Sequence, residues 1–287
     1  MNTLEADTQA FKSTVRSHWD SAAAGWDAHT PDIRAWLRGA TDAMITMAGV
    51  VPGSRVLDVA AGAGDQTLDL AKRVGPKGTV VATDLSPAIV ALAQDRMRLA
   101  GCPQVQCRVA DGEDLMVEAA SFDAAVCRLG LMLFPRPLRG LREMHRALRP
   151  GGYVSTVVFS TPQRNPCVAT LIATALRHAG LPARDPYIAG SLFSLGRPGA
   201  IDALFTQAGF REVATTAVDA PFRTPSVDAY LAFVRSSASP VLQILAGLDT
   251  AASEAAWDDI RDQLHAFDTA TGWEGPNELL ITAARRP

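Results

Sequence analysis

The sequence predicts an α/β fold in which helices cover both faces of a mostly parallel sheet. Short apolar runs rich in β-branched residues alternate with helical patterns over residues 54–160. This alternation favours right-handed crossovers into a parallel sheet. A glycine loop follows the first apolar run, in the segment VLDVAAGAGDQT at 56–67. Because 48% of the 287 residues are hydrophobic, the chain can form a large core.

The expected elements follow from apolar periodicity and from the Gly and Pro residues at the breaks between them. Helices are predicted over 8–28, 31–50, 65–74, 87–100, 137–148, 167–180, 197–208 and 225–270. Strands are predicted over 54–60, 79–83, 105–109, 122–128, 153–160, 212–221 and 277–284. Helical segments precede each of the last two strands, which indicates a seven-stranded sheet with a helical cap over its carboxyl edge.

Particular residues mark where these helices begin and end. Pro31 suits the first turn of the second helix, and Ser86 opens the fourth. Asp65 is the expected N-cap of the helix after the glycine loop. Gly75 and Gly101 are expected just beyond the third and fourth helices, because glycine accepts the backbone conformation common at helix ends.

The glycine loop and the next strand indicate a nucleoside cofactor. Gly62 and Gly64 allow a tight turn and the close approach of a ligand. Roughly twenty residues later Asp84 ends a second apolar run, and this pairing holds the ribose of cofactors in α/β sheets. Thr67 stands where a dinucleotide-binding loop has its third glycine, and no phosphate-binding lysine follows the loop. We therefore expect a cofactor without phosphates, namely S-adenosylmethionine.

Composition argues against several other classes of protein. The net charge is −3 and no run of five basic residues occurs, so nucleic acid is not the expected partner. No apolar stretch is long enough for a membrane span, and the first residues do not resemble a secretory signal, so a cytoplasmic protein is expected. The four cysteines lack metal-ligand spacing, so we expect no metal site and four small buried side chains, at Cys102, Cys107, Cys127 and Cys167.

Five motifs resemble those of the class I S-adenosylmethionine-dependent methyltransferases. Within that class the chain is most similar to the ubiquinone/menaquinone C-methyltransferases and their small-molecule relatives. The glycine loop matches the first motif, a D-x-x-x-G-x-G core. The other motifs are ATDLSPAIV at 82–90, RVADGEDL at 108–115, SFDAAVCRLGLMLFP at 121–135 and EMHRALRPGGYV at 143–154. The resemblance covers about 19–160 and implies a Rossmann-like fold with S-adenosylmethionine as cofactor and S-adenosylhomocysteine as product.

The resemblance also implies where the cofactor is held. Asp84 is expected to accept hydrogen bonds from both ribose hydroxyls, and Leu85 to pack on the adenine face. Asp111 is expected to accept the adenine amino group while the amide of Gly112 donates to a ring nitrogen. The complete expected set is Trp26, Asp58, Ala60, Gly62, Gly64, Asp84, Leu85, Ala110, Asp111, Gly112 and Arg128.

Several members of this set have further or alternative roles. Gly62 and Gly64 are expected beneath the methionine part of the cofactor. Asp58 is expected to order the loop by accepting hydrogen bonds from loop amides, since a buried carboxylate needs partners. Arg128 offers its carbonyl to the cofactor amine, or its side chain reaches the substrate. Trp26 covers the sulfonium, where a cation beside an indole gains about 1 kcal/mol, or it belongs to the core.

The methyl acceptor is expected beside the cofactor, in a pocket with apolar walls. One wall is predicted from Leu131, Met132, Leu133 and Phe134. The late region is expected to add Tyr187, Phe193, Phe222, Tyr230, Phe233 and Trp273. No catalytic base is assigned; among the histidines His29 is a better candidate than His145, His178 or His265.

The expected activity is methyl transfer to an oxygen, nitrogen or carbon atom of a small, partly apolar or aromatic metabolite. The alternative is a protein that binds S-adenosylmethionine without methylating. Three regions are predicted: helical residues 1–50 that cover the cofactor site, the cofactor-binding core 51–160, and 161–287 with the rest of the sheet and the substrate cap. A homodimer is an open alternative to a monomer.

Overall fold

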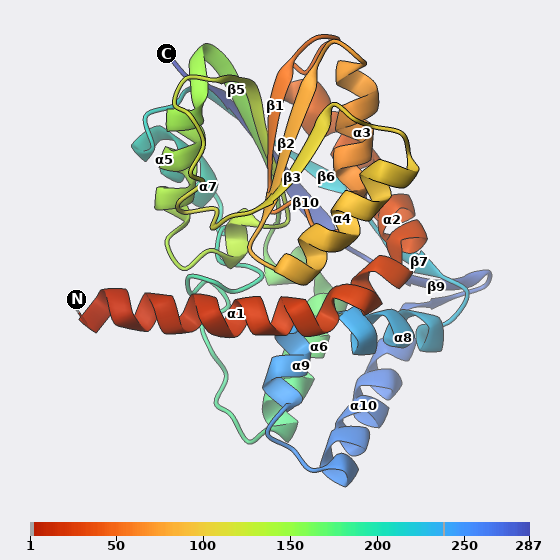
Figure 1. Ribbon diagram of the computed structural model, residues 1–287. Helices are drawn as coiled ribbons and strands as arrows, with labels where there is room; N and C mark the ends of the chain where they lie inside the picture. Colours follow the sequence, from red (N-terminus) through yellow and green to blue (C-terminus); the bar gives the residue numbers. More distant parts are fainter. Residues whose placement is uncertain (1–2, 238) are drawn as a thin grey trace.

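The computed structural model describes residues 3–237 and 239–287, and a seven-stranded sheet lies at its centre (Figure 1). The strand order is β3-β2-β1-β4-β5-β10-β6. The strands are β1 (Arg55–Val59), β2 (Thr79–Asp84), β3 (Val105–Val109), β4 (Phe122–Arg128), β5 (Leu148–Phe159), β6 (Arg211–Asp219) and β10 (Glu278–Arg285). In this sheet β10 runs antiparallel to both β5 and β6, and the pairs formed by β1 to β5 are parallel. The predicted α/β fold with a mostly parallel sheet is confirmed.

Helices pack on both faces of this sheet (Figure 1). One face carries α2 (Thr30–Met47), α3 (Asp65–Val74) and α4 (Pro87–Leu99). The other carries α5 (Pro137–Ala147) and α7 (Ala200–Gln207). Because both faces are covered, the central strand β1 is apolar after its exposed first residue, Arg55, except for Asp58, and its Val56 and Leu57 are fully buried.

The remaining helices lie beyond the carboxyl edge of the sheet. They are α1 (Thr3–Ala28), α6 (Pro166–His178), α8 (Val227–Ser237), α9 (Ser239–Leu245) and α10 (Thr250–Leu264). Figure 1 shows α1 crossing this edge, between the sheet and the other helices of the group. Short 3-10 turns occur at Leu131–Leu133, Pro162–Arg164 and His265–Phe267. Within the described residues, no helix has the length and mean hydropathy that a membrane crossing requires.

A second sheet was not predicted from the sequence. It consists of β7 (Phe222–Thr224), β9 (Gly272–Gly275) and β8 (Asp268–Thr269), in that order. The prediction of helix over 225–270 was therefore wrong at the end of this range, where β8 lies. Strands of two to four residues leave no alternating pattern, and β7 pairs with a strand about fifty residues away, so only tertiary packing defines them.

One predicted helix cap was wrong and another was confirmed. Asp65 was the predicted N-cap of α3, but the N-cap is Gly64, which has a positive φ of 84°. The side chain of Asp65 accepts a hydrogen bond from Arg128 instead. Ser86 caps α4 as expected, because its hydroxyl accepts the N–H of Ile89 at 3.1 Å. The sheet edge beside these two helix starts is the place where the predicted site residues meet.

Candidate active site

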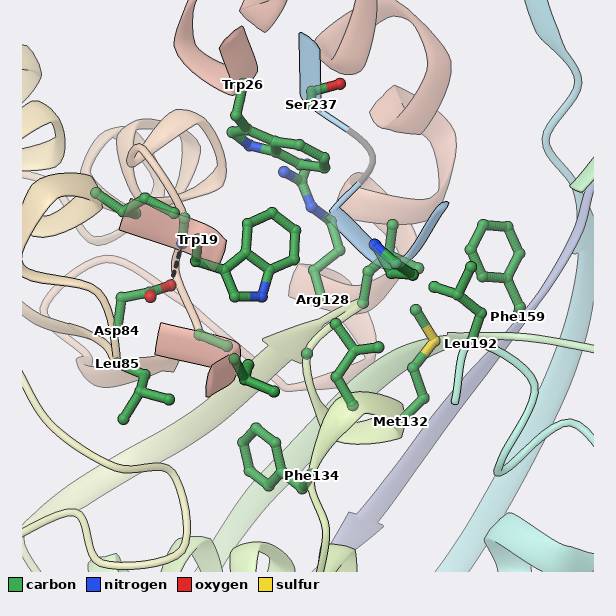
Figure 2. A pocket seen from close by; sticks show the side chains of 18 of the residues that line it. Trp19, Trp26, Asp84, Leu85, Arg128, Met132, Phe134, Phe159, Leu192 and Ser237 are labelled. Carbon is green, nitrogen blue, oxygen red and sulfur yellow. Dashed lines mark hydrogen bonds between the residues drawn. The ribbon is translucent and has the colours of Figure 1, made fainter. Parts of the chain in front are cut away.

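One cavity opens at the carboxyl edge of the sheet, between the ends of β1 to β5 and the helices α1, α6 and α8 (Figure 2). Asp58 and Gly64 do not line it. All other predicted site residues do, namely Trp26, Ala60, Gly62, Asp84, Leu85, Ala110, Asp111, Gly112 and Arg128. Parallel strands end at one edge of a sheet, which is why segments far apart in the sequence meet here.

Asp84 lies at the end of β2 with its carboxylate fixed by two main-chain donors. The N–H of Gly62 donates to Oδ2 at 3.0 Å, and the N–H of Ser86 donates to Oδ1 at 3.1 Å. Burial raises the pKa of Asp84 from its ordinary value. A carboxylate has about four lone-pair positions, so acceptor capacity remains for a ligand in the cavity.

Asp58 organises the glycine loop through side chains, not through the loop amides that were predicted. Gln66 donates to Oδ1 at 2.6 Å and Thr67 donates to Oδ2 at 2.7 Å. The carboxyl group is fully buried, and this burial raises its pKa to about 7. Asp58 therefore joins β1 to the first turn of α3, and it does so behind the glycine loop and outside the cavity lining.

Gly64 is required by packing against α4. A Cβ on Gly64 would lie 3.2 Å from the Cβ of Ala93, and its φ is in the left-handed region. This glycine thus allows close helix packing behind the loop, while Gly62 lies at the cavity.

The side chain of Arg128 is bound on the protein side of the cavity. Its guanidinium donates to both oxygens of Asp65, at 2.7 and 2.8 Å, and to Oγ1 of Thr41 at 2.9 Å. Both members of the ion pair are buried. Three hydrogen bonds from this side chain are made to the protein, so the interpretation in which it reaches the substrate loses support. The other interpretation, in which the main-chain carbonyl of Arg128 binds the cofactor amine, is kept.

The segment after β3 forms the far end of the cavity. The carboxylate Oδ1 of Asp111 accepts the N–H of Glu113 at 2.9 Å. A Cβ on Gly112 would lie 2.2 Å from Cζ of Phe134, so this position has room only for glycine. The ring of Phe134 thereby closes the cavity beside the two residues expected to contact adenine.

Lys12, Trp19 and Glu113 also line this cavity, and the sequence analysis missed all three. Lys12, on α1, is 7% exposed and donates to Asp111 Oδ2 and Glu113 Oε2, both at 2.6 Å. The available signal was the spacing of apolar residues along α1. Such spacing places one helical face toward the sheet edge, formed by Phe11, Val15, Trp19 and Trp26.

Two tryptophans from this face enclose the middle of the cavity. Trp19 and Trp26 contact each other edge to face, with ring centroids 5.7 Å apart. In Figure 2 the indole of Trp19 appears between Asp84 and Arg128, with Trp26 above it. Indole faces suit a cationic or flat ligand.

Beyond the tryptophans, the cavity continues into an apolar compartment. It is lined by Trp36, Phe159, Val168, Leu171, Phe222, Tyr230 and Phe233. Of the four residues predicted to form one wall of the acceptor pocket, Met132, Leu133 and Phe134 line the cavity, with Phe134 at its end beside Gly112, whereas Leu131 is in the core. Of the six aromatic residues expected from the late region, three line the cavity: Phe222, Tyr230 and Phe233. The other three do not and pack elsewhere: Tyr187 beneath Arg197, Phe193 on Phe159, and Trp273 on Tyr230.

Polar atoms of this apolar compartment are bonded to the protein. Nε1 of Trp36 donates to the carbonyl of Ala220 at 2.7 Å, and the hydroxyl of Ser237 donates to the carbonyl of Phe233 at 2.5 Å. Burial holds the pKa of Tyr230 well above its ordinary value, so its hydroxyl stays protonated. The compartment therefore offers ring faces and methyl groups to a ligand.

The histidines considered as bases lie outside the cavity lining. His29 pairs with Asp32 at 3.1 Å, His178 with Asp259 at 2.7 Å and His265 with Asp268 at 2.7 Å. His145 packs its ring on Phe210. Within the part of the chain that the structure describes, no group of three His, Cys, Asp or Glu side chains could hold a metal ion.

The charges of the cavity fit a nucleoside that carries no phosphate. Two cationic side chains line it, Lys12 and Arg128, and each is paired with carboxylates. Asp65 also stands at the start of α3, where a phosphate would otherwise meet the positive end of the helix. A ribose acceptor at Asp84 and apolar faces around it suit adenosine, so the residues fit S-adenosylmethionine.

Comparison with known proteins places the chain in a family. Residues 33–180 match the model of the ubiE/COQ5 methyltransferase family. The chain is 38% identical over 131 residues to the ubiquinone/menaquinone biosynthesis C-methyltransferase UbiE of Ectopseudomonas mendocina. That match covers 45% of this chain and 51% of the relative, so the chain spans about half the length of this curated relative.

Two further matches extend beyond the cofactor-binding core. The nocamycin O-methyltransferase of Saccharothrix syringae is 30% identical over 213 residues, which cover 71% of this chain and 76% of that protein. The solved structure of YcgJ from Bacillus subtilis has the same fold, with a TM-score of 0.59 and 18% identity, over 87% of this chain and 99% of that one. The resemblance stated from the five motifs is confirmed: this chain belongs to the ubiE/COQ5 methyltransferase family.

Proposed function

We propose that the chain is an S-adenosylmethionine-dependent methyltransferase that acts on a small, largely apolar, ring-containing metabolite. One observation carries this proposal: the strand-end residues Gly62, Asp84, Asp111 and Arg128 meet in one cavity. The same cavity continues into the apolar compartment. Family membership supports the activity, since the matched relatives are named as methyltransferases.

The cofactor would be held by the residues at the strand ends. Asp84 would accept the ribose hydroxyls with the lone pairs left free by Gly62 and Ser86. Leu85, Asp111 and Gly112 would surround adenine, and the carbonyl of Arg128 would accept the amine of the methionine part. When bound, S-adenosylmethionine supplies an electrophilic methyl group beside Trp19 and Trp26.

The acceptor would occupy the apolar compartment formed by the following residues: Trp36, Phe159, Val168, Leu171, Phe222, Tyr230 and Phe233. The rings of Phe222 and Phe233 stack with centroids 5.0 Å apart, which gives the compartment a rigid flat wall. A flat, apolar acceptor makes use of such a wall, whereas a charged one would lose its hydration without gaining a partner. One matched relative is named as a C-methyltransferase and another as an O-methyltransferase, so the atom methylated is open.

This site would accelerate the reaction by alignment and by excluding water. Methyl transfer is an in-line displacement, for which positioning alone can supply a large part of the rate. Tyr230 stays protonated, and Arg128 is fixed by Asp65, so neither is suited to remove a proton. An acceptor that reacts as a neutral nucleophile fits such a site.

Two measurements test the proposal. Isothermal titration of the full chain with S-adenosylmethionine and S-adenosylhomocysteine should give stoichiometric binding. Incubation with S-adenosylmethionine and a panel of phenols, hydroquinones and aryl amines should then produce S-adenosylhomocysteine in an acceptor-dependent way. Binding without any acceptor-dependent product would favour the non-methylating alternative, and absence of binding would refute the proposal.

The three predicted regions, a cytoplasmic location and a homodimer remain proposals. Light scattering of the purified chain distinguishes a dimer from a monomer. The net charge of −3 argues against nucleic acid as a partner.

A further inference from the structure

We propose that Lys12 is a positioning residue that fastens α1 over the adenine end of the cofactor and sets the rate at which the cofactor product leaves. This inference rests on the proposed function, because it takes Asp111 as the residue that contacts adenine. It concerns a cluster of four side chains, here called the Lys12 ion cluster: Lys12, Asp111, Glu113 and Arg136.

Lys12 and Glu113 are the buried members of the Lys12 ion cluster, whereas Asp111 and Arg136 are partly exposed. Nζ of Lys12 lies 2.6 Å from Asp111 Oδ2 and 2.6 Å from Glu113 Oε2. Glu113 is 1% exposed and also accepts the N–H of Arg136 at 2.6 Å and its Nε at 3.0 Å. The carboxylates of Asp111 and Glu113 would repel each other if the ammonium of Lys12 were absent. Lys12 therefore allows the two carboxylates to lie close together.

The two halves of α1 are attached in different ways. Its later half is fixed against neighbouring helices: Ser86 Oγ donates to Asp20 at 2.5 Å, and Asp27 pairs with Arg96. Gly25 lies so close to the main chain of Ser236 that a Cβ would not fit. The earlier half contacts the sheet edge through the ion pairs of Lys12, which join it to the segment after β3.

Lys12 connects the helix that covers the cavity to Asp111, the residue expected to contact adenine. Phe11, Val15 and Trp19 from the same stretch of helix line the cavity, so a shift of this half of α1 would open it. Asp111 uses Oδ1 for Glu113 and Oδ2 for Lys12, yet each oxygen keeps a further lone pair. Adenine and Lys12 can therefore bind the carboxylate of Asp111 at the same time. Binding of the cofactor is thereby coupled to the position in which α1 covers the cavity.

The experiment measures the binding kinetics of S-adenosylhomocysteine to the full chain by stopped-flow tryptophan fluorescence. Lys12→Met should accelerate dissociation by about tenfold or more, because charge-assisted bonds that hold the cover are lost. Lys12→Arg should restore slow dissociation.

The matched control is Arg16→Met, which removes the same charge one turn further along α1. Arg16 is half exposed and lies 4.0 Å from Asp20, so its loss should leave the dissociation rate unchanged within about twofold. If Lys12→Met does not fold, the double variant Lys12→Met/Glu113→Gln lowers the uncompensated charge of the cluster. The double variant should show the same rapid dissociation.

The outcomes separate this inference from the proposed function. If Lys12→Met or the double variant dissociates at the wild-type rate while Asp84→Ala weakens binding, the role of Lys12 is refuted and the cofactor site stands. If the wild type binds no S-adenosylhomocysteine, the proposed function fails and this inference fails with it. If Lys12→Met dissociates rapidly and Lys12→Arg does not restore slow dissociation, Lys12 acts by packing alone and the inference is wrong.

Discussion

The guanidinium of Arg128, at the end of β4, donates to both carboxylate oxygens of Asp65, the first residue of α3, at 2.7 and 2.8 Å. The side chains are 5% and 4% exposed. The pair joins two segments of the cavity wall that the sequence keeps more than sixty residues apart. It also directs the side chain of Asp65 to Arg128 and holds the guanidinium of Arg128 in place.

Loss of one partner of this pair should destabilise the fold. We expect Asp65→Ala to lower the free energy of unfolding by about 3–5 kcal/mol, because a buried guanidinium is left without its counter-ion. Urea unfolding measures the change. The control is Asp95→Ala, whose partner Arg98 is 69% exposed, and for which a change below about 1 kcal/mol is expected. Equal, small effects of the two substitutions would contradict the prediction.

Asp84→Ala should weaken the binding of S-adenosylhomocysteine by about 2–4 kcal/mol, since charge-assisted bonds to the ribose are lost. The fold should remain intact, because the N–H groups of Gly62 and Ser86 can bond to water at the cavity. Calorimetry measures the affinity and circular dichroism the fold. Asp114→Ala removes the same charge from an exposed position near Asp111 and should bind as the wild type does. An unchanged affinity in Asp84→Ala would refute the ribose assignment.

Asp58 should make stability depend on pH in a direction opposite to that of most carboxylates. Its pKa is about 7 in the folded protein and near 3.8 in the unfolded chain, so the folded state binds more protons between these values. Its contribution to stability is present below about pH 4 and is lost as the pH rises through 7, by up to about 4 kcal/mol.

Comparison with Asp58→Asn isolates this contribution. The amide does not titrate, so the variant should gain stability relative to the wild type between pH 5 and pH 8, as measured by urea unfolding at each pH. All other titrating groups are shared by the two proteins and cancel in the difference. A difference that stays constant over this range would show that Asp58 titrates outside it.

Ala60 and Gly130 should show strong coupling in a double-mutant cycle. Ala60 has a φ of 55°, and a Cβ on Gly130 would lie 2.4 Å from the Cβ of Ala60. We expect Ala60→Gly to stabilise the fold by about 0.5–1 kcal/mol, since the left-handed conformation costs alanine roughly 1–2 kcal/mol. Gly130→Ala should be strongly destabilising, and less so when combined with Ala60→Gly. Additive effects in thermal unfolding would contradict the proposed contact.

Much of the candidate site could be predicted because its residues follow strands. Gly62, Asp84 and Asp111 each come directly after an apolar run, and the ends of parallel strands share one edge. The same reasoning misjudged Asp58 and Gly64, since burial behind the loop is not visible in the spacing of a motif. It also missed Lys12, because a lysine in a helix is usually solvated, and here two carboxylates from a segment about a hundred residues away make its burial possible.

The sequence by itself determined the α/β fold, the cofactor class and most of the residues at the strand ends, because local apolar periodicity and glycine loops are properties of neighbouring residues. Only the tertiary structure decided the pairing of Arg128 with Asp65, the small sheet formed by β7, β9 and β8, and the aromatic side chains that line the apolar compartment. These depend on contacts between residues distant in the chain, and their free energy comes from burial and charge pairing that exist only once the chain has folded.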